Sequence, residues 1–335
     1  MKRKLIAVAV SAALLPMGVM ADIDIYGKVH LSADSLDNDT TSSTYLSSNS
    51  SRLGVKGSTD FENGLTGMFQ LEGGISMSDD GSADTRWGTT RDSYLGLKGG
   101  FGTLLAGRLP AANQYVYDAN LFADQVGDAG TFTGTAMPGR VNDALHYVLP
   151  AFGSATIALT HKFEQGTEDG SANGARVTFN AAGVDLGLTY FALGDALAAG
   201  GTPESVIAVS AGYDFGMGSV KAMGVQNTNE GGVDDGDRTI MTLGAGFNAG
   251  SGTAKIQYTT ADEGVKNSDD GATMIAVGYD YPLYKNTIVY VSYATVDNDD
   301  GGTYHPFNWG HGASPGAPAA GDKASGISIG MVYDF

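Results

Sequence analysis

Apolar residues alternate with polar or very small residues along most of this chain, in segments of about ten residues. The terminal segment Gly326–Phe335 and the internal segment Val184–Tyr190 show the pattern clearly. Side chains of a β-strand point alternately to its two faces, so this period predicts strands whose faces meet different surroundings. The spacing of an amphipathic helix is hardly present. We predict about sixteen strands, at residues 22–34, 50–60, 65–77, 88–98, 101–108, 140–149, 154–163, 174–181, 184–192, 205–215, 218–228, 238–248, 251–260, 271–281, 287–296 and 323–335.

The segments between these strands are of two kinds. Short turns with Gly, Asn or Pro, such as Glu62–Gly64 and Pro282–Asn286, alternate with longer insertions rich in Asp, Asn and Gly, such as Asp234–Asp237 and Asp297–Asp300. Hairpins are therefore the repeating unit, with short connections at one end and long ones at the other. A β-propeller also repeats, with blades of about 40–45 residues. The chain has only two tryptophans and lacks the blade signatures, which argues against a propeller.

The apolar strand face is thin, and Tyr and Phe residues gather near the strand ends. Glycine accounts for 50 of the 335 residues, about twice its usual share, which disfavours a helix-rich enzyme. Alternating strands, aromatic girdles and an even strand number are typical of outer-membrane barrels, whose closure satisfies every backbone group in lipid. A barrel of this size is too wide for side chains to fill and leaves an aqueous channel. We predict an all-β fold, a 16-stranded antiparallel transmembrane β-barrel.

The first residues differ from all that follow. Three basic residues, Lys2–Arg3–Lys4, precede the apolar run Leu5–Leu15, and Val19–Ala21 offers small residues for cleavage. This pattern predicts a signal peptide at residues 1–21, followed by a single barrel domain at residues 22–335. Cleavage would change the formal net charge from −18 to −21. Such an acid excess argues against nucleic-acid binding, and the absence of cysteine excludes disulfides and thiolate metal sites.

Several short motifs follow one another along the chain. They are Ile25–Lys28, Ser51–Gly57, Arg91–Gly102, Gly107–Arg108, Arg140–Tyr147, Tyr281–Thr287 and Val332–Phe335. In this order they resemble the general diffusion porins of Gram-negative outer membranes, especially the glycine-rich branch of Neisseria-like bacteria. The resemblance covers essentially the whole chain after residue 21. It implies an outer-membrane location, a homotrimer, and contact with outer-membrane lipid and lipopolysaccharide, and Phe335 resembles the signal read by the barrel-insertion machinery.

In porins of this kind the third loop folds into the lumen and narrows it. The corresponding insertion here spans about residues 109–139 and carries three acids, Asp118, Asp124 and Asp128. The family sets such acids against a wall of basic residues, and the positions that match by motif are Lys28, Arg52, Arg91 and Arg140.

The alternation supports this placement independently. Arg140, for example, is opposite in phase to Val141 and Leu145, so it is expected to face the lumen when they face lipid. An arginine in lipid at mid-depth would cost about 2–4 kcal/mol. Arg108, at the root of the third loop, is interpreted either as a pore-lining residue or as an anchor of the loop.

Scattered Ser, His and Asp residues form no catalytic motif, so we predict no enzyme activity and no cofactor. His305 and His311 share a loop but are too few for zinc, and no acidic cluster has EF-hand spacing, so no metal site is predicted. The predicted function is a water-filled channel for passive diffusion of small hydrophilic solutes and ions. Its acid excess predicts a weak cation preference, unless that excess is confined to the external loops.

A substrate-preferring channel, for example for oligosaccharides, is the alternative. Its sliding track would use Tyr115, Tyr117 and Phe122 of the third loop, with Trp87 near the mouth. Ordinary packing of the loop explains the same residues.

Overall fold

The computed structural model describes residues 22–78, 87–88, 91–110, 115–133, 139–198, 200–264 and 268–335. The predicted signal peptide lies outside these ranges. The described chain is almost all β-strand, with two short helices, α1 (Val116–Ala119) and α2 (Gly130–Thr133), and 3-10 turns at Asp195–Leu197 and Glu230–Gly232. Within these ranges, no helix is long and apolar enough to cross a membrane.

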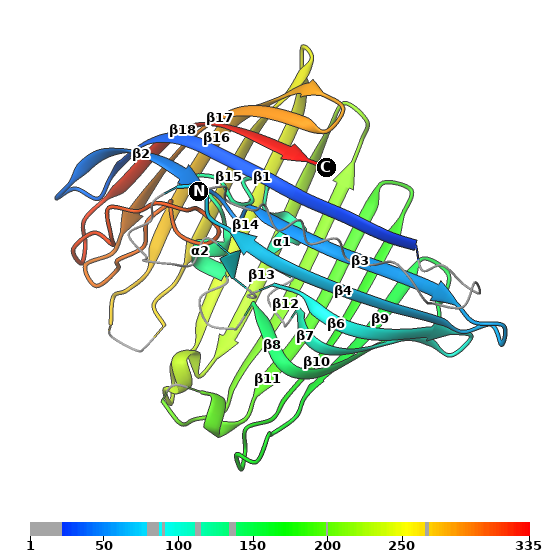
Figure 1. The fold of residues 1–335 in the computed structure, drawn as a ribbon. Coiled ribbons are helices and arrows are strands. Elements are labelled where there is room, and N and C mark those ends of the chain that lie inside the picture. The colour runs from blue at the N-terminus through cyan, green and yellow to red at the C-terminus, as the bar shows by residue number, and fades with distance from the viewer. Residues whose placement is uncertain are drawn as a thin grey trace, which may run out of the picture.

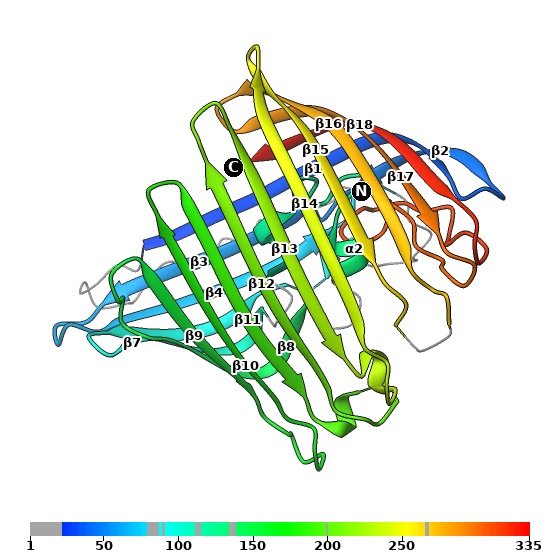
Figure 2. The same ribbon diagram turned by 180° about the vertical axis from the view of Figure 1, so that it is seen from behind.

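The strands form one closed antiparallel sheet (Figures 1 and 2). They are β1 (Asp22–Asp37), β2 (Ser42–Ser48), β3 (Arg52–Asp60), β4 (Thr66–Ile75), β5 (Trp87–Gly88), β6 (Ser93–Gly99), β7 (Gly102–Pro110), β8 (Arg140–Val148), β9 (Ala155–Lys162), β10 (Ala172–Ala181), β11 (Val184–Leu193), β12 (Glu204–Asp214), β13 (Gly218–Thr228), β14 (Arg238–Ala249), β15 (Gly252–Ala261), β16 (Ala272–Tyr284), β17 (Thr287–Asn298) and β18 (Ala324–Asp334). Apart from β2 with β3 and β5 with β6, neighbours along the chain pair with one another, and β18 pairs with β1 to close the ring.

Two barrel strands are interrupted. β2 and β3 both pair with β1, and β5 and β6 both pair with β4, so each couple forms one strand of the barrel. The break between β2 and β3 contains Ser50, whose φ of 48° is incompatible with a continuous strand. Counted in this way, the 18 segments of the sheet make 16 barrel strands, and the predicted fold is confirmed.

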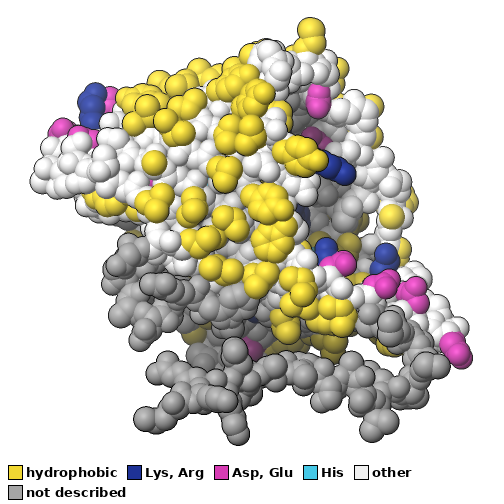
Figure 3. Space-filling view, turned by 45° about the horizontal axis from the view of Figure 1, so that its top comes forward, with side chains coloured by type: hydrophobic (Ala, Val, Ile, Leu, Met, Phe, Trp, Pro, Cys, Tyr) yellow, Lys and Arg dark blue, Asp and Glu magenta, His cyan; other side chains and the backbone are white. Residues whose placement is uncertain are grey.

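Burial alternates along the strands as their sequence predicts. In β12, Val206 and Ala208 are buried, whereas Ile207 and Val209, which alternate with them, are 48% and 56% exposed on the outside. Figure 3 shows hydrophobic side chains gathered over one outer face of the barrel, with charged side chains toward its margins. This is the surface that a barrel presents to lipid.

The third loop lies between β7 and β8, and its described residues 115–133 fold into the lumen, with α1 against β12 and β13. Its apolar side chains are buried against the barrel wall: Tyr115, Val116 and Phe132 pack in one cluster with strand residues, and Phe122 packs in a second cluster with Ala276 and Ala294. Figures 1 and 2 show both helices inside the ring of strands.

The alternation of side chains predicts the wrong face of the barrel for one residue at the start of β8. Val141 is 5% exposed and packs with Leu109 and Ala144 in the inner cluster, rather than facing lipid. Asp143 has a φ of 56°, and this left-handed residue shifts the phase of the strand. Strict period two therefore does not hold across this position.

Candidate functional site

A hollow of about 320 Å³ lies between the third loop and the first strands of the barrel. We call it the constriction hollow. It is lined by Lys28, Arg52, Glu72, Arg91, Asp92, Tyr117, Ala123, Asp124 and Arg140. The structure thus brings together the four bases that the motifs single out, which we call the basic wall, and one of the three acids of the third loop.

Two further acids, Glu72 and Asp92, are paired with arginines of the basic wall. Arg91 forms an ion pair through Nε with Glu72, and Arg140 does so with Asp92. Glu72 also accepts a hydrogen bond of 2.9 Å from the Tyr26 hydroxyl. The alternation of β4 puts Glu72 on the lumen face, opposite in phase to Leu71, but only the tertiary structure shows which base it meets.

Lys28 is held more loosely than the arginines of these pairs. Its Nζ lies 4.0 Å from Asp334 Oδ1 on the neighbouring strand β18. Across the hollow, Asp124 and Tyr117 belong to the third loop. Bases therefore outnumber acids in the lining of the constriction hollow by four to three.

Asp118 lies elsewhere in the lumen. It accepts a hydrogen bond of 2.6 Å from Arg176 Nη2 on β10 and one of 2.7 Å from the Ser210 hydroxyl on β12. These contacts tie α1 to the strands behind it. Asp118 does not line the constriction hollow.

Asp128 is fully buried inside the third loop. Its carboxyl accepts hydrogen bonds from the backbone nitrogens of Asp124 (2.6 Å) and Gly130 (2.7 Å) and from the Asn120 side chain. Burial, together with the charge of Asp124, raises the pKa of this carboxyl to about 8. Asp128 thus organises the turn of the loop and does not reach the hollow.

Arg108 is not among the residues that line the constriction hollow. Its Nη1 donates a hydrogen bond of 2.6 Å to Asn142 Oδ1 on β8, the strand that follows the third loop. Phe335 closes the barrel: it exchanges backbone hydrogen bonds of 3.0 and 3.1 Å with Gly27. Its ring occupies the space where a Cβ at Gly27 would lie, 2.5 Å from Phe335 Cζ.

A family model described as Gram-negative porin matches residues 7–301. The chain belongs to the Gram-negative porin family. The outer membrane porin protein 32 of Delftia acidovorans is 29% identical over 360 residues, covering 100% of both chains. The major outer membrane protein P.IB of Neisseria gonorrhoeae is 35% identical over 148 residues, 41% of this chain and 39% of that protein.

A solved structure, the anion-selective porin from Comamonas acidovorans, has a TM-score of 0.79 and 26% identity. The match covers 94% of this chain and 100% of that one. The predicted family and the outer-membrane location are confirmed. Members of this family are channels rather than enzymes.

In this porin the third loop is fixed to the wall opposite the basic wall. Lys255 on β15 donates from Nζ to Leu121 O (2.8 Å) and Gln125 Oε1 (3.0 Å). Gln257, two residues along, accepts from Leu121 N (2.8 Å) and donates to Gly127 O (3.0 Å). Three of these four bonds use the backbone of the loop, and the fourth uses the side chain of Gln125.

Small residues let the loop lie close to this wall. A Cβ at Gly278 would lie 2.8 Å from Phe122 Cε1, and a Cβ at Gly127 would lie 2.6 Å from Ala276 Cβ. Both contacts are closer than carbon atoms tolerate, so no larger side chain fits without movement. We call this surface the docking wall, defined by Gly244, Lys255, Gln257, Ala276, Gly278 and Ala294.

The eighth loop (residues 299–323, between β17 and β18) also packs against the third loop. Pro306 O accepts a hydrogen bond of 2.8 Å from Gly127 N, and Tyr304 stacks on Phe132 with ring centroids 4.5 Å apart. His311 of the same loop lies 3.3 Å from Asp34 on β1, both side chains being buried. Within the described ranges, no group of three or more His, Asp or Glu side chains is arranged to hold a metal ion.

The aromatic residues of the third loop do not form a track. Tyr115 and Phe122 are fully buried between the loop and the barrel wall, and Tyr117 alone of the three is exposed, at 44%. The side chain of Trp87 lies outside the described part of the structure. Loop packing accounts for the two buried rings.

Proposed function

We propose that this porin forms a water-filled channel for passive diffusion of small hydrophilic solutes and ions, with a constriction that favours anions. The observation that carries the proposal is the lining of the constriction hollow, where four bases face three acids. Charge at the narrowest point of a pore dominates selectivity, because an ion there is closest to the wall and has the least water around it.

The weak cation preference expected from the net charge is not supported. A similar porin is described as anion-selective. Many of the acids of this chain are exposed on long loops, such as Asp234 and Asp235 after β13 and Asp299 and Asp300 after β17. Salt screens exposed charges beyond about 10 Å at 0.1 M, so they influence the constriction less than the basic wall does.

Reversal potentials in planar bilayers with a salt gradient test the proposal. We expect chloride to permeate more readily than potassium, and a preference for potassium would contradict it. Arg52→Ser should shift the reversal potential toward cation preference, since it removes a base from the hollow. Lys285→Ser is the matched control, because it removes the same charge from the short turn between β16 and β17.

Liposome swelling with a series of uncharged solutes separates this channel from one that prefers oligosaccharides. Flux that falls smoothly with solute size is expected for an open pore. Saturable flux for one class of sugar would contradict it. The burial of Tyr115 and Phe122 favours the open pore.

We further propose a cleaved signal peptide at residues 1–21, a single barrel domain at residues 22–335, a homotrimer, and contact with outer-membrane lipid and lipopolysaccharide. Phe335 is proposed as an assembly signal, supported by its place where β18 closes on β1. Deleting Phe335 should lower the yield of folded barrel in the outer membrane while export continues. An unchanged yield would contradict this role.

A further inference from the structure

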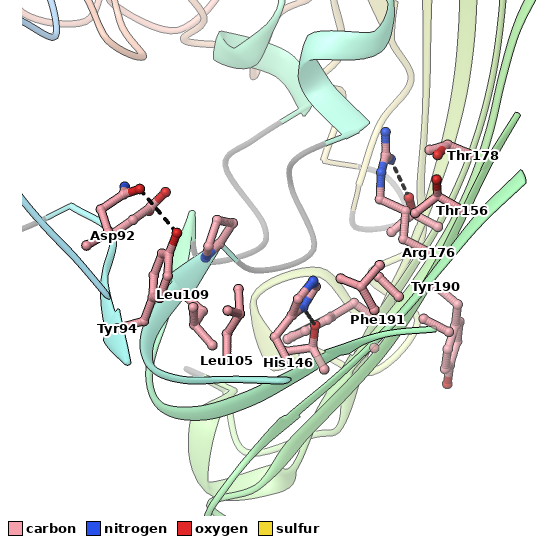
Figure 4. Close-up of a pocket in the computed structure, with 18 residues that line it drawn as sticks. Asp92, Tyr94, Leu105, Leu109, His146, Thr156, Arg176, Thr178, Tyr190 and Phe191 are labelled. Carbon is pink, nitrogen blue, oxygen red and sulfur yellow. Dashed lines mark hydrogen bonds between the residues drawn. The ribbon is translucent and has the colours of Figure 1, made fainter. Parts of the chain in front are cut away.

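Asp124 is the acid that the third loop places in the constriction hollow, yet no polar contact fixes its carboxylate. Asp118 is held by Arg176, which points from β10 toward α1 (Figure 4) and donates 2.6 Å to it. Asp128 is held by hydrogen bonds within the loop. Within the described ranges, the carboxylate oxygens of Asp124 form no hydrogen bond and no ion pair. The place of this charge therefore depends on what its side chain rests against.

Gly310 of the eighth loop lies directly against the Asp124 carboxylate. A Cβ at Gly310 would lie 2.3 Å from Asp124 Oδ1 and 3.3 Å from Asp124 Cγ. The φ of Gly310 is 79°, a conformation that glycine adopts readily and other residues rarely do. The backbone of the eighth loop is thus the surface on which the charged end of Asp124 rests.

On its other side, Gly310 contacts the start of a strand of the basic wall. Ser50, two residues before Arg52, donates a hydrogen bond of 3.2 Å from its hydroxyl to Gly310 O. A Cβ at Gly310 would lie 3.1 Å from the Ser50 Oγ, so it would occupy the space between Ser50 and Asp124. Neither Gly310 nor Ser50 lines the constriction hollow. The eighth loop therefore separates the acid of the third loop from the strand that carries Arg52, and it does so from behind the hollow.

The eighth loop is fixed on both sides of Gly310. The indole of Trp309 packs on Gly130 of the third loop, where a Cβ would lie 2.0 Å from Trp309 Cδ1. Gly312 N donates a hydrogen bond of 2.9 Å to Asn49 Oδ1, at the end of β2. These contacts hold Gly310 at a defined place between the third loop and the barrel.

We propose that Gly310 is a positioning residue for ion selection, because it sets where the Asp124 carboxylate stands relative to the basic wall. The inference rests on the proposed function, since it names a residue that tunes the selectivity of the same hollow without lining it. The interaction between two charges weakens as their distance grows. An acid moved away from the basic wall therefore offsets its bases less, and the constriction becomes more favourable for anions.

Gly310→Ala tests this role. The added methyl group would take the space between Ser50 and Asp124, and the end of the flexible Asp124 side chain can move aside at the least cost. The carboxylate then moves away from the strand of Arg52. We expect the ratio of chloride to potassium permeability, obtained from reversal potentials, to rise about 1.5- to twofold, which is less than Asp124→Asn should cause by removing the charge.

The decisive measurement repeats Gly310→Ala in the Asp124→Asn background. Once the charge is gone, moving the side chain should leave the permeability ratio of the Asp124→Asn channel unchanged. Such non-additivity is expected for residues that act through one another, and a merely structural role of Gly310 would not produce it. An equal shift in both backgrounds would overturn the proposal, as would an unchanged ratio in the single variant.

Gly316→Ala is the matched control. Gly316 lies in the same loop with a φ of 94°, but nothing lies within 4 Å of a Cβ at that position. The control carries the same kind of backbone strain without touching Asp124, so its permeability ratio should stay at the wild-type value. An equal rise from Gly316→Ala would trace the effect to strain in the eighth loop and overturn the role of Gly310.

Ser50→Ala keeps the test decisive if Gly310→Ala yields no folded channel. It removes the bond to Gly310 O without adding atoms. We expect it to change the permeability ratio, and we expect the Asp124→Asn background to abolish that change. An unchanged ratio in Ser50→Ala, or a change that persists without the charge, would overturn the proposal.

The outcomes also separate this inference from the proposed function. A wild-type channel that prefers potassium contradicts the proposed anion preference, while the comparison of the two backgrounds still decides the role of Gly310. An anion-preferring channel whose permeability ratio does not respond to Gly310→Ala overturns the positioning role and leaves the proposed function intact.

Discussion

The two sides of the lumen carry similar cationic side chains, but these differ in how exposed they are and in what they bind. On the basic wall, Arg140 keeps 20% of its side chain exposed beside a water-filled hollow. On the docking wall, Lys255 is 4% exposed and binds the backbone of the third loop. Both are cations with acidic partners, Asp92 and Asp280.

The neighbours of each cation explain the difference. The docking wall contains Gly244, Ala276 and Gly278, whose small size lets the third loop lie directly on the sheet. The basic wall instead places arginines in front of the loop, and their length and hydration keep the gap open. The pore therefore lies on one side of the loop because side-chain size, as well as charge, differs between the two walls.

Lys255→Met should cause the largest effect. It leaves Asp280, whose side chain is 27% exposed, without its partner at 2.9 Å, and it removes two bonds to the third loop. Breaking such a pair costs about 3 kcal/mol. We expect a lower thermal unfolding temperature of the barrel and stronger open-channel noise, measured by heat modifiability on gels and by bilayer recording.

Lys323→Met is the matched control for that change. Its pair with Asp297, 3.0 Å long, is about two-thirds exposed on both sides, and such pairs contribute about 0–1 kcal/mol. Equal effects of the two substitutions would show that Lys255 does not fix the loop.

Gly278→Val should disturb the docking wall from the sheet side. The added Cβ would meet Phe122 of the third loop and push the loop toward the basic wall, at a cost of about 1–3 kcal/mol. Single-channel conductance should fall. Gly224→Val is the control, since nothing lies within 4 Å of a Cβ at that position, and a similar loss of conductance there would refute the explanation.

The stability of the third loop should decrease as pH rises. The packed Asp128 keeps its proton up to the raised pKa of about 8, whereas in an unpacked loop the carboxyl loses it above its usual pKa of 3.8. The loss of stability therefore accumulates between these values, at about 1.4 kcal/mol per pH unit, and ends above pH 8. Open-channel noise should grow from pH 5 to pH 8 and then level off.

Asp128→Asn is the control for this dependence, because an amide does not titrate over the range. If open-channel noise still grows with pH in this variant, a titratable group other than Asp128 causes the pH dependence.

Asp124→Asn should have the smallest effect. It changes the charge balance of the constriction hollow, and it also lowers the raised pKa of Asp128, to which the charge of Asp124 contributes. It removes an acid from the constriction hollow, so anion preference should increase by about two- to fivefold, equivalent to about 0.5–1 kcal/mol. Reversal potentials measure it. Asp118→Asn is the comparison, since Asp118 binds Arg176 outside the hollow, and a larger shift from Asp118 would contradict the assignment.

Much of the barrel could be predicted because each strand carries its own signal. The alternation of side chains, the turn residues and the aromatic residues at strand ends are all local features of the sequence. They predicted the number of barrel strands and the position of the third loop between β7 and β8. The prediction missed β2 and the inward Val141, because left-handed residues, Ser50 and Asp143, interrupt the period where no Gly or Pro marks the place.

The site was less predictable than the strands. Motifs pointed to Lys28, Arg52, Arg91 and Arg140, which the structure places around one hollow. They did not distinguish Asp124, which lines it, from Asp128, which is buried in the loop. That distinction depends on the path of the loop backbone, which no pattern along the chain encodes.

The sequence by itself determined that this chain closes into a barrel and that bases lie on its inner face, because both follow from the alternation of side chains along a strand. Only the tertiary structure decided which acids meet those bases and where the third loop rests. These depend on contacts between residues more than 100 positions apart, such as Leu121 with Lys255. These long-range contacts are stabilised by the close fit between packed surfaces, and not by the conformational preference of any single segment.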